Sequence, residues 1–317
     1  MVPPVLLTHC IDGERRFHGA TRPLTWKGRC GGHTGRVGEE KSSVVLLHGQ
    51  PGSGSDWREV IARLPVTVQC VAADRPGYRS SPHRAAGLLG NAEIVLADLD
   101  RAGIEQAVLV GHSYGGGVAL TAAALAPHRV RGLVLVASIG PGAVTGWDRL
   151  LAAPLAGPVC AVTAWSLTPW LVRAHLSTLQ RIRRRPLDHD EWVNFHIWGN
   201  ARYAHGAMWR TFLTEQRDFV HGIDALDTVI TQVRAPSLIL ADPADTLIPV
   251  ATAHALNDRL PGSQLQLVAY GGHSLPRRNP QAVADAITTF TATLPPHPPQ
   301  HGTSHPHAGR NTSKCAE

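Results

Sequence analysis

The chain has 317 residues, of which 43% are hydrophobic, and this length is enough to bury one large α/β core together with an insertion. Its formal net charge of +6 is carried almost wholly by arginine, and the densest basic run, residues 181–185, fits a solvated helix end better than an organised nucleic-acid or membrane surface. The five cysteines are scattered and include no Cys-x-x-Cys pair, which argues against a disulfide framework and for reduced thiols in the cytoplasm.

Residues 1–41 form a glycine-rich N-terminal segment in which no secondary structure is clearly indicated. The first ten residues lack the basic start and the long apolar core of a signal peptide. Within the stretch 28–38, no Gly-Lys-Ser or Gly-Lys-Thr follows a strand, and a phosphate-binding loop is therefore not predicted.

Residues 42–139 alternate short β-branched runs with helical stretches. The predicted strands lie at 43–47, 66–71, 107–110 and 130–136. The predicted helices lie near 56–64, 91–102 and 114–126. Fully apolar strands that alternate with helices predict an α/β fold with a mostly parallel, doubly wound sheet covered on both faces, and this segment would form its first half.

Residues 140–225 lack strand-like runs and hold six of the eight tryptophans, which predicts a helical cap inserted between the two halves of the sheet. Residues 150–172 carry no charge over a length that could span a membrane. Three prolines interrupt this run at intervals that suit short helices, so membrane contact is not expected. Most of the tryptophans are expected to pack within the cap, whereas any that face the cleft would form a wall for a bulky apolar substrate. The candidates for that wall are Trp165, Trp170 and Trp198.

Residues 226–294 return to the alternating pattern and are expected to complete the sheet. Strands are predicted at 237–240 and 264–268, and helices near 250–260 and 280–293. Residues 295–317 are rich in proline and histidine and are expected to be disordered. No carboxylate or cysteine closely accompanies these histidines, so the tail predicts no metal site.

The most informative segment is Gly-His-Ser-Tyr-Gly, residues 111–115, because a predicted strand leads into it and an alanine-rich helical stretch leads out. A serine between two glycines on a strand-to-helix turn is typical of a nucleophile elbow, in which the tight turn pushes the hydroxyl of Ser113 clear of the sheet. The competing interpretation is a serine in an ordinary strand–helix loop.

A serine hydroxyl becomes a good nucleophile only with a base to take its proton and an acid to orient that base. In a doubly wound sheet these groups belong at the carboxyl ends of strands. Asp242 and Asp245 follow the strand predicted at 237–240, and His273 follows the last predicted strand. The chain order of Ser113, an aspartate and His273 is that of the α/β-hydrolase topology.

On these motifs, residues 42–294 resemble the α/β-hydrolase family, in the branch that contains capped serine esterases, haloperoxidase-like and epoxide-hydrolase-like proteins. In that family the loop that supplies the triad acid reads roughly Gly-x-x-Asp-x-x-x-Pro. With Pro249 as its proline, the resemblance implies that Asp245 is the acid and that Asp242 is a turn-forming residue.

The resemblance also implies an oxyanion hole, in which two backbone N–H groups face the developing negative oxygen. Residues 48–52, His-Gly-Gln-Pro-Gly, resemble the family motif His-Gly-x-Pro, whose x residue supplies one N–H, and this assigns that role to Gln50. The second N–H would come from Tyr114, directly after the nucleophile. His48 is expected either to be bonded within its own loop or to line the substrate pocket.

Together these features predict a cytoplasmic serine hydrolase that cleaves a carboxylic ester or related acyl bond of a small hydrophobic molecule, with no metal ion and no organic cofactor. Cofactor-free haloperoxidase-like (perhydrolase) enzymes and carbon–carbon bond hydrolases keep the same triad and stay open as alternatives. Epoxide hydrolases and haloalkane dehalogenases share His-Gly-x-Pro but carry an aspartate where this chain has Ser113. A non-catalytic protein that binds a small ligand in the cleft would not need all three triad residues. The sequence predicts no nucleic-acid partner and leaves the oligomeric state open.

Overall fold

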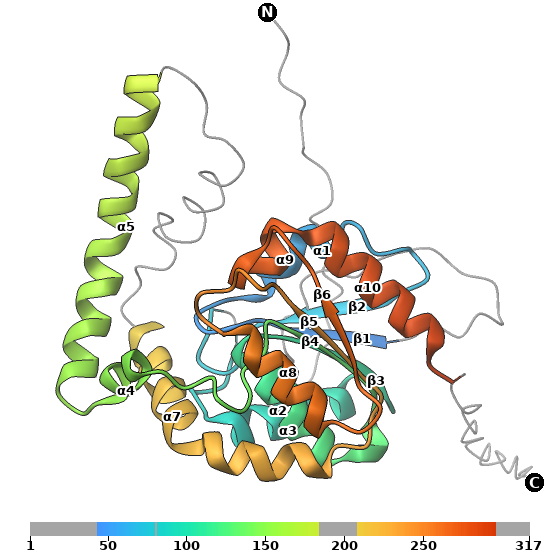
Figure 1. Cartoon of the computed structure of the whole chain (residues 1–317). Coiled ribbons are helices and arrows are strands. Elements are labelled where there is room, and N and C mark those ends of the chain that lie inside the picture. Colours follow the sequence, from blue (N-terminus) through green and yellow to red (C-terminus); the bar gives the residue numbers. More distant parts are fainter. Residues whose placement is uncertain (1–42, 80, 184–207, 296–317) are drawn as a thin grey trace, which may run out of the picture.

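The fold is built on one parallel sheet, seen in a computed structural model that describes residues 43–79, 81–183 and 208–295 (Figure 1). Six strands lie in the order β2-β1-β3-β4-β5-β6, and every neighbouring pair is parallel. Their bounds are β1 (Ser43–Leu47), β2 (Gln69–Ala73), β3 (Ala107–His112), β4 (Val130–Val136), β5 (Ser237–Ala241) and β6 (Gln264–Leu267). The predicted α/β class and the parallel, doubly wound sheet are therefore confirmed.

Helices cover both faces of the sheet, because successive residues of a strand point to opposite sides. In β1, Val45 and Leu47 pack into one apolar cluster, while Val44 and Leu46 pack into the other. The helices that contribute to the first cluster are α2 (Leu88–Arg101), α3 (Tyr114–Leu125), α7 (Met208–Gln232) and α8 (Val250–Arg259). Those that contribute to the second cluster are α1 (Arg58–Ile61), α9 (Leu275–Arg278) and α10 (Pro280–Thr293).

The strand order brings the predicted functional loops together. The chain passes from β1 to β2 on one side and then returns to β3 on the other side of β1, so the strand order reverses between β1 and β3. At such a switch point the loops leave a crevice at the carboxyl ends of the two strands, where ligands bind in open α/β sheets. The loop after β1 begins with His48, and the turn after β3 contains Ser113.

Two elements of the first half differ from their predictions. The strand predicted at 66–71 is displaced, because β2 pairs in register with β1 only from Gln69 onward. Val66 lies in the turn before this strand and is 76% exposed, while two alanines complete the pairing despite their low strand propensity. The helix predicted at 56–64 is a 3₁₀ turn, η1 (Gly54–Trp57), followed by the four-residue α1.

Between the two halves of the sheet, the described chain is helical. The short α4 (Gly146–Ala152) precedes α5 (Ala156–Arg183), which is a single helix of 28 residues that extends away from the sheet (Figure 1). The expectation of short helices is therefore wrong for α5. Pro158 lies in the first turn, where a missing N–H is tolerated, and Pro169 removes one backbone donor from the interior without ending the helix.

The last helix of this region, α7, belongs to both parts of the fold. It runs without a break through residue 225, where the cap was predicted to end. Its C-terminal turns place Leu226 and Ile230 in the apolar cluster on one face of the sheet. Trp198, the segment 1–41 and residues 296–317 of the predicted tail lie outside the described residues.

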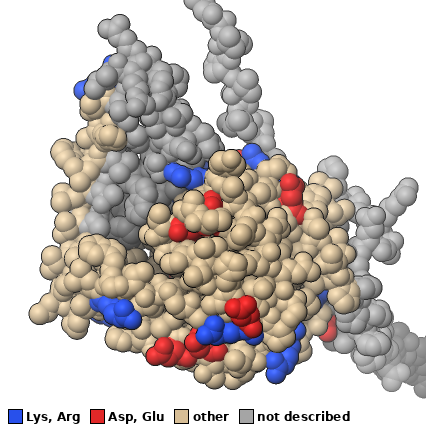
Figure 2. Space-filling model, viewed as in Figure 1, with Lys and Arg blue, Asp and Glu red and all other residues tan. Residues whose placement is uncertain are grey.

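Charged side chains of both signs are interspersed on the face shown in Figure 2. Within the part of the chain that the structure describes, no helix combines the length and the apolar character needed to cross a membrane.

Replacing Ile287 on α10 by alanine is expected to lower the free energy of unfolding by about 2–5 kcal/mol. The buried side chain packs in the second apolar cluster, against one face of the sheet, and its loss leaves a cavity. Leu267→Ala on β6 is the matched control, since Leu267 is 51% exposed, and it is expected to stay within about 1 kcal/mol of wild type. Urea denaturation measures both changes. Equal losses in the two variants would contradict the packing assigned to α10.

Candidate active site

The turn between β3 and α3 holds Ser113 in a strained backbone conformation. Its φ of 54° and ψ of −121° lie outside the regions that L-residues favour, at a cost of about 1–3 kcal/mol. A Cβ on Gly115 would lie 2.5 Å from the carbonyl oxygen of Leu47, and one on Gly111 would overlap the backbone of Gly115. The glycines on either side of the serine are thus required by close backbone approach, which is the geometry of a nucleophile elbow.

Side chains from two other loops meet Ser113. The hydroxyl of Ser113 lies 3.0 Å from Nε2 of His273, and Nδ1 of His273 lies 2.9 Å from Oδ2 of Asp245. Because a carboxylate only accepts hydrogen bonds, Nδ1 carries the proton, and Nε2 is left to accept from the serine. Oδ1 of Asp245 accepts the N–H groups of Leu247 and Ile248 at 2.8 and 2.9 Å, which fixes the carboxylate. The arrangement can move a proton from the serine to the histidine.

Asp242 ties the loop after β5 to the loop that carries His273. Its Oδ1 accepts the N–H of Ala244, and its Oδ2 accepts those of Gly271 and Gly272 at 2.8 and 2.7 Å. Burial raises the pKa of Asp242, but these three donors outweigh burial and hold the pKa below its ordinary value. The bond to Ala244 closes a turn, as predicted, whereas the bonds to the two glycines were not predicted.

A second histidine, His112, contacts His273 directly. Nε2 of His112 donates to the backbone carbonyl of His273 at 2.7 Å, and the two imidazole rings lie 5.0 Å apart. Burial, followed by the charge of His273, lowers the pKa of His112 to about 3, so its ring is neutral at neutral pH. His112 was not among the residues predicted for the site, although its position directly before Ser113 in the predicted elbow indicated that it lies there.

The two residues predicted to supply oxyanion N–H groups approach Ser113 from different elements. Gln50 lies in the loop after β1, and Tyr114 is the first residue of α3. A Cβ on Gly49 would lie 3.0 Å from the Cβ of Ser113, so the first loop passes very close to the serine. The side chains of both predicted residues donate hydrogen bonds to residues of α7.

His48 is bonded within the loops around it. Its Nδ1 donates to the carbonyl of Gly49 at 2.8 Å, and its Nε2 accepts the backbone N–H of Arg75 at 2.9 Å. Burial, followed by the charge of Arg75, lowers the pKa of His48 well below its ordinary value, which keeps the ring neutral, as these two bonds require. The residue is fully buried and adds no accessible surface to a pocket.

The tryptophans proposed as a substrate wall are not brought together with Ser113 by any described contact. Trp170 lies on α5 and is 67% exposed. The side chain of Trp165 and the whole of Trp198 lie outside the described residues. The pocket role of these three residues therefore stays a prediction.

Among the described residues, no group of three or more His, Cys, Asp or Glu side chains is arranged to hold a metal ion. No disulfide joins the two cysteines in these ranges, Cys70 and Cys160.

A family model described as the alpha/beta hydrolase fold matches residues 42–276. A 2-hydroxymuconate semialdehyde hydrolase from Pseudomonas putida is 28% identical over 265 residues, which cover 78% of this chain and 86% of that protein.

Two solved structures share the fold. An esterase from Thermogutta terrifontis superposes with a TM-score of 0.61 at 18% identity, covering 79% of this chain and 89% of that one. A meta-cleavage product hydrolase from Pseudomonas fluorescens IP01 superposes with a TM-score of 0.60 at 21% identity, covering 80% and 91%. At these identities the likeness concerns the fold alone.

Asp242→Asn is expected to lower the free energy of unfolding at pH 7 and to have less effect in acid. The folded-state pKa of Asp242 lies below the value of about 3.9 in an unfolded chain. Its carboxylate therefore contributes stability that is fully present above the unfolded pKa and is lost as the pH falls through the folded pKa. Urea denaturation from pH 7 down to about pH 2 measures the difference in the free energy of unfolding between wild type and variant.

The matched control for this series is Asp258→Asn, which changes an exposed aspartate on α8. It is expected to change the free energy of unfolding at pH 7 by less than Asp242→Asn does. If the difference in the free energy of unfolding between wild type and Asp242→Asn stayed constant through the acid range, the stabilising role given to the Asp242 carboxylate would be wrong.

Proposed function

The chain belongs to the α/β-hydrolase fold family, and from this premise we propose that it is a serine hydrolase that cleaves a carboxylic ester or a related acyl compound. The observation that carries the proposal is the pair of hydrogen bonds that join Ser113 to His273 and His273 to Asp245, at 3.0 and 2.9 Å. The strained backbone of Ser113 supports the same role, because backbone strain of this kind clusters at active sites.

In the acylation step, Oγ of Ser113 attacks the carbonyl carbon of the substrate while Nε2 of His273 takes the hydroxyl proton. The carboxylate of Asp245 stays ionised and stabilises the imidazolium through Nδ1. The backbone N–H groups of Gln50 and Tyr114 bind the negative charge that develops on the carbonyl oxygen. The imidazolium then protonates the leaving alkoxide, and the alcohol departs.

In the deacylation step, water attacks the acyl group on Ser113, and His273 takes a proton from that water. Collapse of the tetrahedral intermediate returns the proton to the serine oxygen and releases the carboxylic acid. These steps use the residues of this chain and water.

We propose a small hydrophobic molecule as the substrate. The support is the tryptophan content of residues 140–225 and the apolar surface that α5 leaves exposed, to which Trp170 contributes. Aromatic side chains of this kind can cover an apolar acyl or alcohol group.

A second candidate is hydrolysis of a carbon–carbon bond next to a carbonyl group. The observation that favours it is the similarity to 2-hydroxymuconate semialdehyde hydrolase over 78% of this chain. The same serine, histidine and aspartate would serve, because attack on a carbonyl carbon and protonation of the leaving group are common to both reactions.

A fluorophosphonate probe is expected to label the wild-type protein and to lose that labelling in Ser113→Ala and in His273→Ala, because the probe reacts only with an activated serine. Ser274→Ala is the matched control and is expected to label normally, since Ser274 lies one residue from His273 but outside the elbow. Gel fluorescence and peptide mass spectrometry read the result. Absence of labelling in a well-folded wild type would sink the proposal and leave a small-ligand binding protein as the better account.

Rates with p-nitrophenyl esters of increasing acyl length, compared with the rate with 2-hydroxymuconate semialdehyde, separate the two candidate reactions. The ester proposal predicts that the value of kcat/KM is higher for the esters and rises by up to about fourfold for each methylene buried against apolar surface. Ser113→Ala supplies the background rate. Faster turnover of the semialdehyde, with a flat ester series, would replace the ester proposal by the carbon–carbon one.

A further inference from the structure

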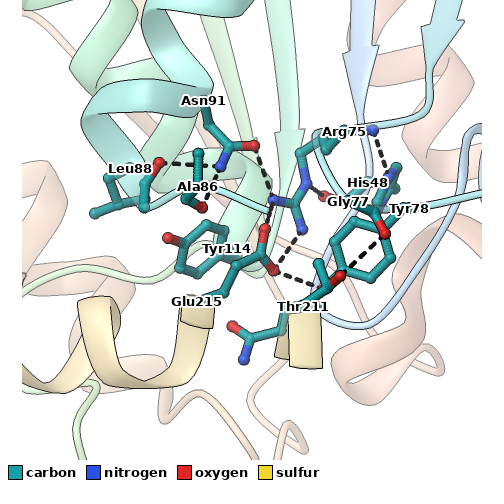
Figure 3. A network of polar contacts seen from close by, with 12 residues as sticks. His48, Arg75, Gly77, Tyr78, Ala86, Leu88, Asn91, Tyr114, Thr211 and Glu215 are labelled. Atoms are coloured by element: carbon teal, nitrogen blue, oxygen red, sulfur yellow. Dashed lines mark hydrogen bonds and ion pairs between the residues drawn. The ribbon is translucent and has the colours of Figure 1, made fainter. Parts of the chain in front are cut away.

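A fully buried ion pair joins Arg75, in the loop after β2, to Glu215 on α7 (Figure 3). Tyr78 donates its hydroxyl proton to Oε2 of Glu215 at 2.6 Å, and Nη1 of Arg75 donates to Oδ1 of Asn91 at 3.2 Å. Burial and then the charge of Glu215 raise the pKa of Tyr78, so its phenol stays protonated and continues to donate. Removing two charges from water is costly, and such a pair is by itself weak grounds for stability.

The Arg75 guanidinium holds the backbone that leads to Gln50. Nε of Arg75 donates to the carbonyl of His48 at 2.7 Å, and Nη2 donates to the carbonyl of Gly49 at 3.0 Å. Nδ1 of His48 donates to the same Gly49 oxygen at 2.8 Å. Both acceptor positions of the Gly49 oxygen are thus in use.

These bonds determine the direction of one particular N–H group. The carbonyl of Gly49 and the N–H of Gln50 belong to the same planar peptide, and this peptide is trans. In a trans peptide the C=O and the N–H point in opposite directions. Fixing the Gly49 oxygen toward Arg75 therefore fixes the Gln50 N–H on the side away from Arg75. Hydrogen bonds to a carbonyl also polarise the peptide, which strengthens the N–H as a donor.

The neighbouring residues of α7 hold the same region. The side chain of Gln50 donates to Oε1 of Gln216 at 3.0 Å, and the hydroxyl of Tyr114 donates to Oδ2 of Asp218 at 2.9 Å. Glu215 and these two α7 residues lie within about one helical turn of one another. One turn of α7 is therefore bonded to both residues that carry the proposed oxyanion N–H groups.

We propose that Arg75 and Glu215 are positioning residues for the oxyanion site: Glu215 holds the Arg75 guanidinium, and the guanidinium aims the Gln50 N–H by holding the Gly49 carbonyl. This inference rests on the proposed serine-hydrolase function. It gives α7 a part in the reaction through the residues that α7 holds in place.

Arg75→Lys tests the link to the peptide, because lysine keeps the positive charge beside Glu215 but lacks the planar fork that reaches two carbonyls at once. The value of kcat for a p-nitrophenyl ester is expected to fall on the order of 100-fold, as for a misplaced catalytic group, while KM stays nearly constant. The inhibition constant of a trifluoromethyl ketone, whose hemiketal oxyanion occupies the same position, is expected to rise in parallel. Glu59→Gln, which breaks the exposed pair with Arg63, is the matched control and is expected to leave both values unchanged.

A double variant, Arg75→Met with Glu215→Leu, separates positioning from simple structural support. It removes both charges and keeps a similar buried volume, but it also leaves the Tyr78 hydroxyl and the Gly49 carbonyl without these partners, so its melting temperature is measured first and activity is compared well below it. Positioning predicts that the folded variant remains slow and binds the ketone weakly. A double variant with wild-type kcat and ketone affinity would overturn the inference, as would an Arg75→Lys variant with wild-type values.

Labelling of the wild type by the fluorophosphonate probe distinguishes the two possible failures. If the wild type is not labelled, the serine-hydrolase function fails and the positioning role falls with it. If the wild type is labelled and the Arg75 and Glu215 variants hydrolyse the ester at the wild-type rate, only the positioning role is wrong.

Discussion

The close approach between the end of β1 and the start of α3 is the constraint on which the rest of the site depends. Gly115 packs against the carbonyl of Leu47 with no room for a Cβ, and Ser113 takes a positive φ as a result of the same tight turn. This contact lies at the switch point of the sheet, where the strand order reverses. Backbone packing alone therefore places the loop after β1 beside the serine, without any contribution from polar contacts. The strain at the turn, about 1–3 kcal/mol, is balanced by the packed strands and helices on both faces.

Buried polar contacts then orient the groups that packing brings near. His273 is held from two sides, by Asp242 through the backbone of its loop and by His112 through its own carbonyl. The loop of Gln50 is held through Arg75, and Arg75 is held by Glu215. The guanidinium of Arg75 and the carboxylate of Glu215 have their donors and acceptors matched, which is the condition under which burying them is tolerable. The proposed serine chemistry thus depends on supporting residues outside the Ser113, His273 and Asp245 set.

Sequence reasoning succeeded where the physical restriction is local. The elbow glycines are restricted by a turn of a few residues, and five of the six strands, β1, β3, β4, β5 and β6, begin at the predicted residue. It failed where the deciding contact is distant. Glu215 lies 140 residues from Arg75, and His112 lies 161 residues from His273, so neither pair leaves a local pattern. The start of β2 is decided by its pairing with β1, which begins at Gln69. The β-branched residues just before this strand, such as the exposed Val66, made the sequence prediction start too early.

The proposed mechanism requires Ser113 to carry the acyl group during turnover. Acid quenching of the reaction with p-nitrophenyl butanoate within the first turnover, followed by peptide mass spectrometry, tests this requirement directly. A butanoyl group is expected on the peptide that contains Ser113, and none is expected on that peptide in His273→Ala. Release of product with no acylated peptide at any time, or a butanoyl group on another residue such as Ser274, would contradict it.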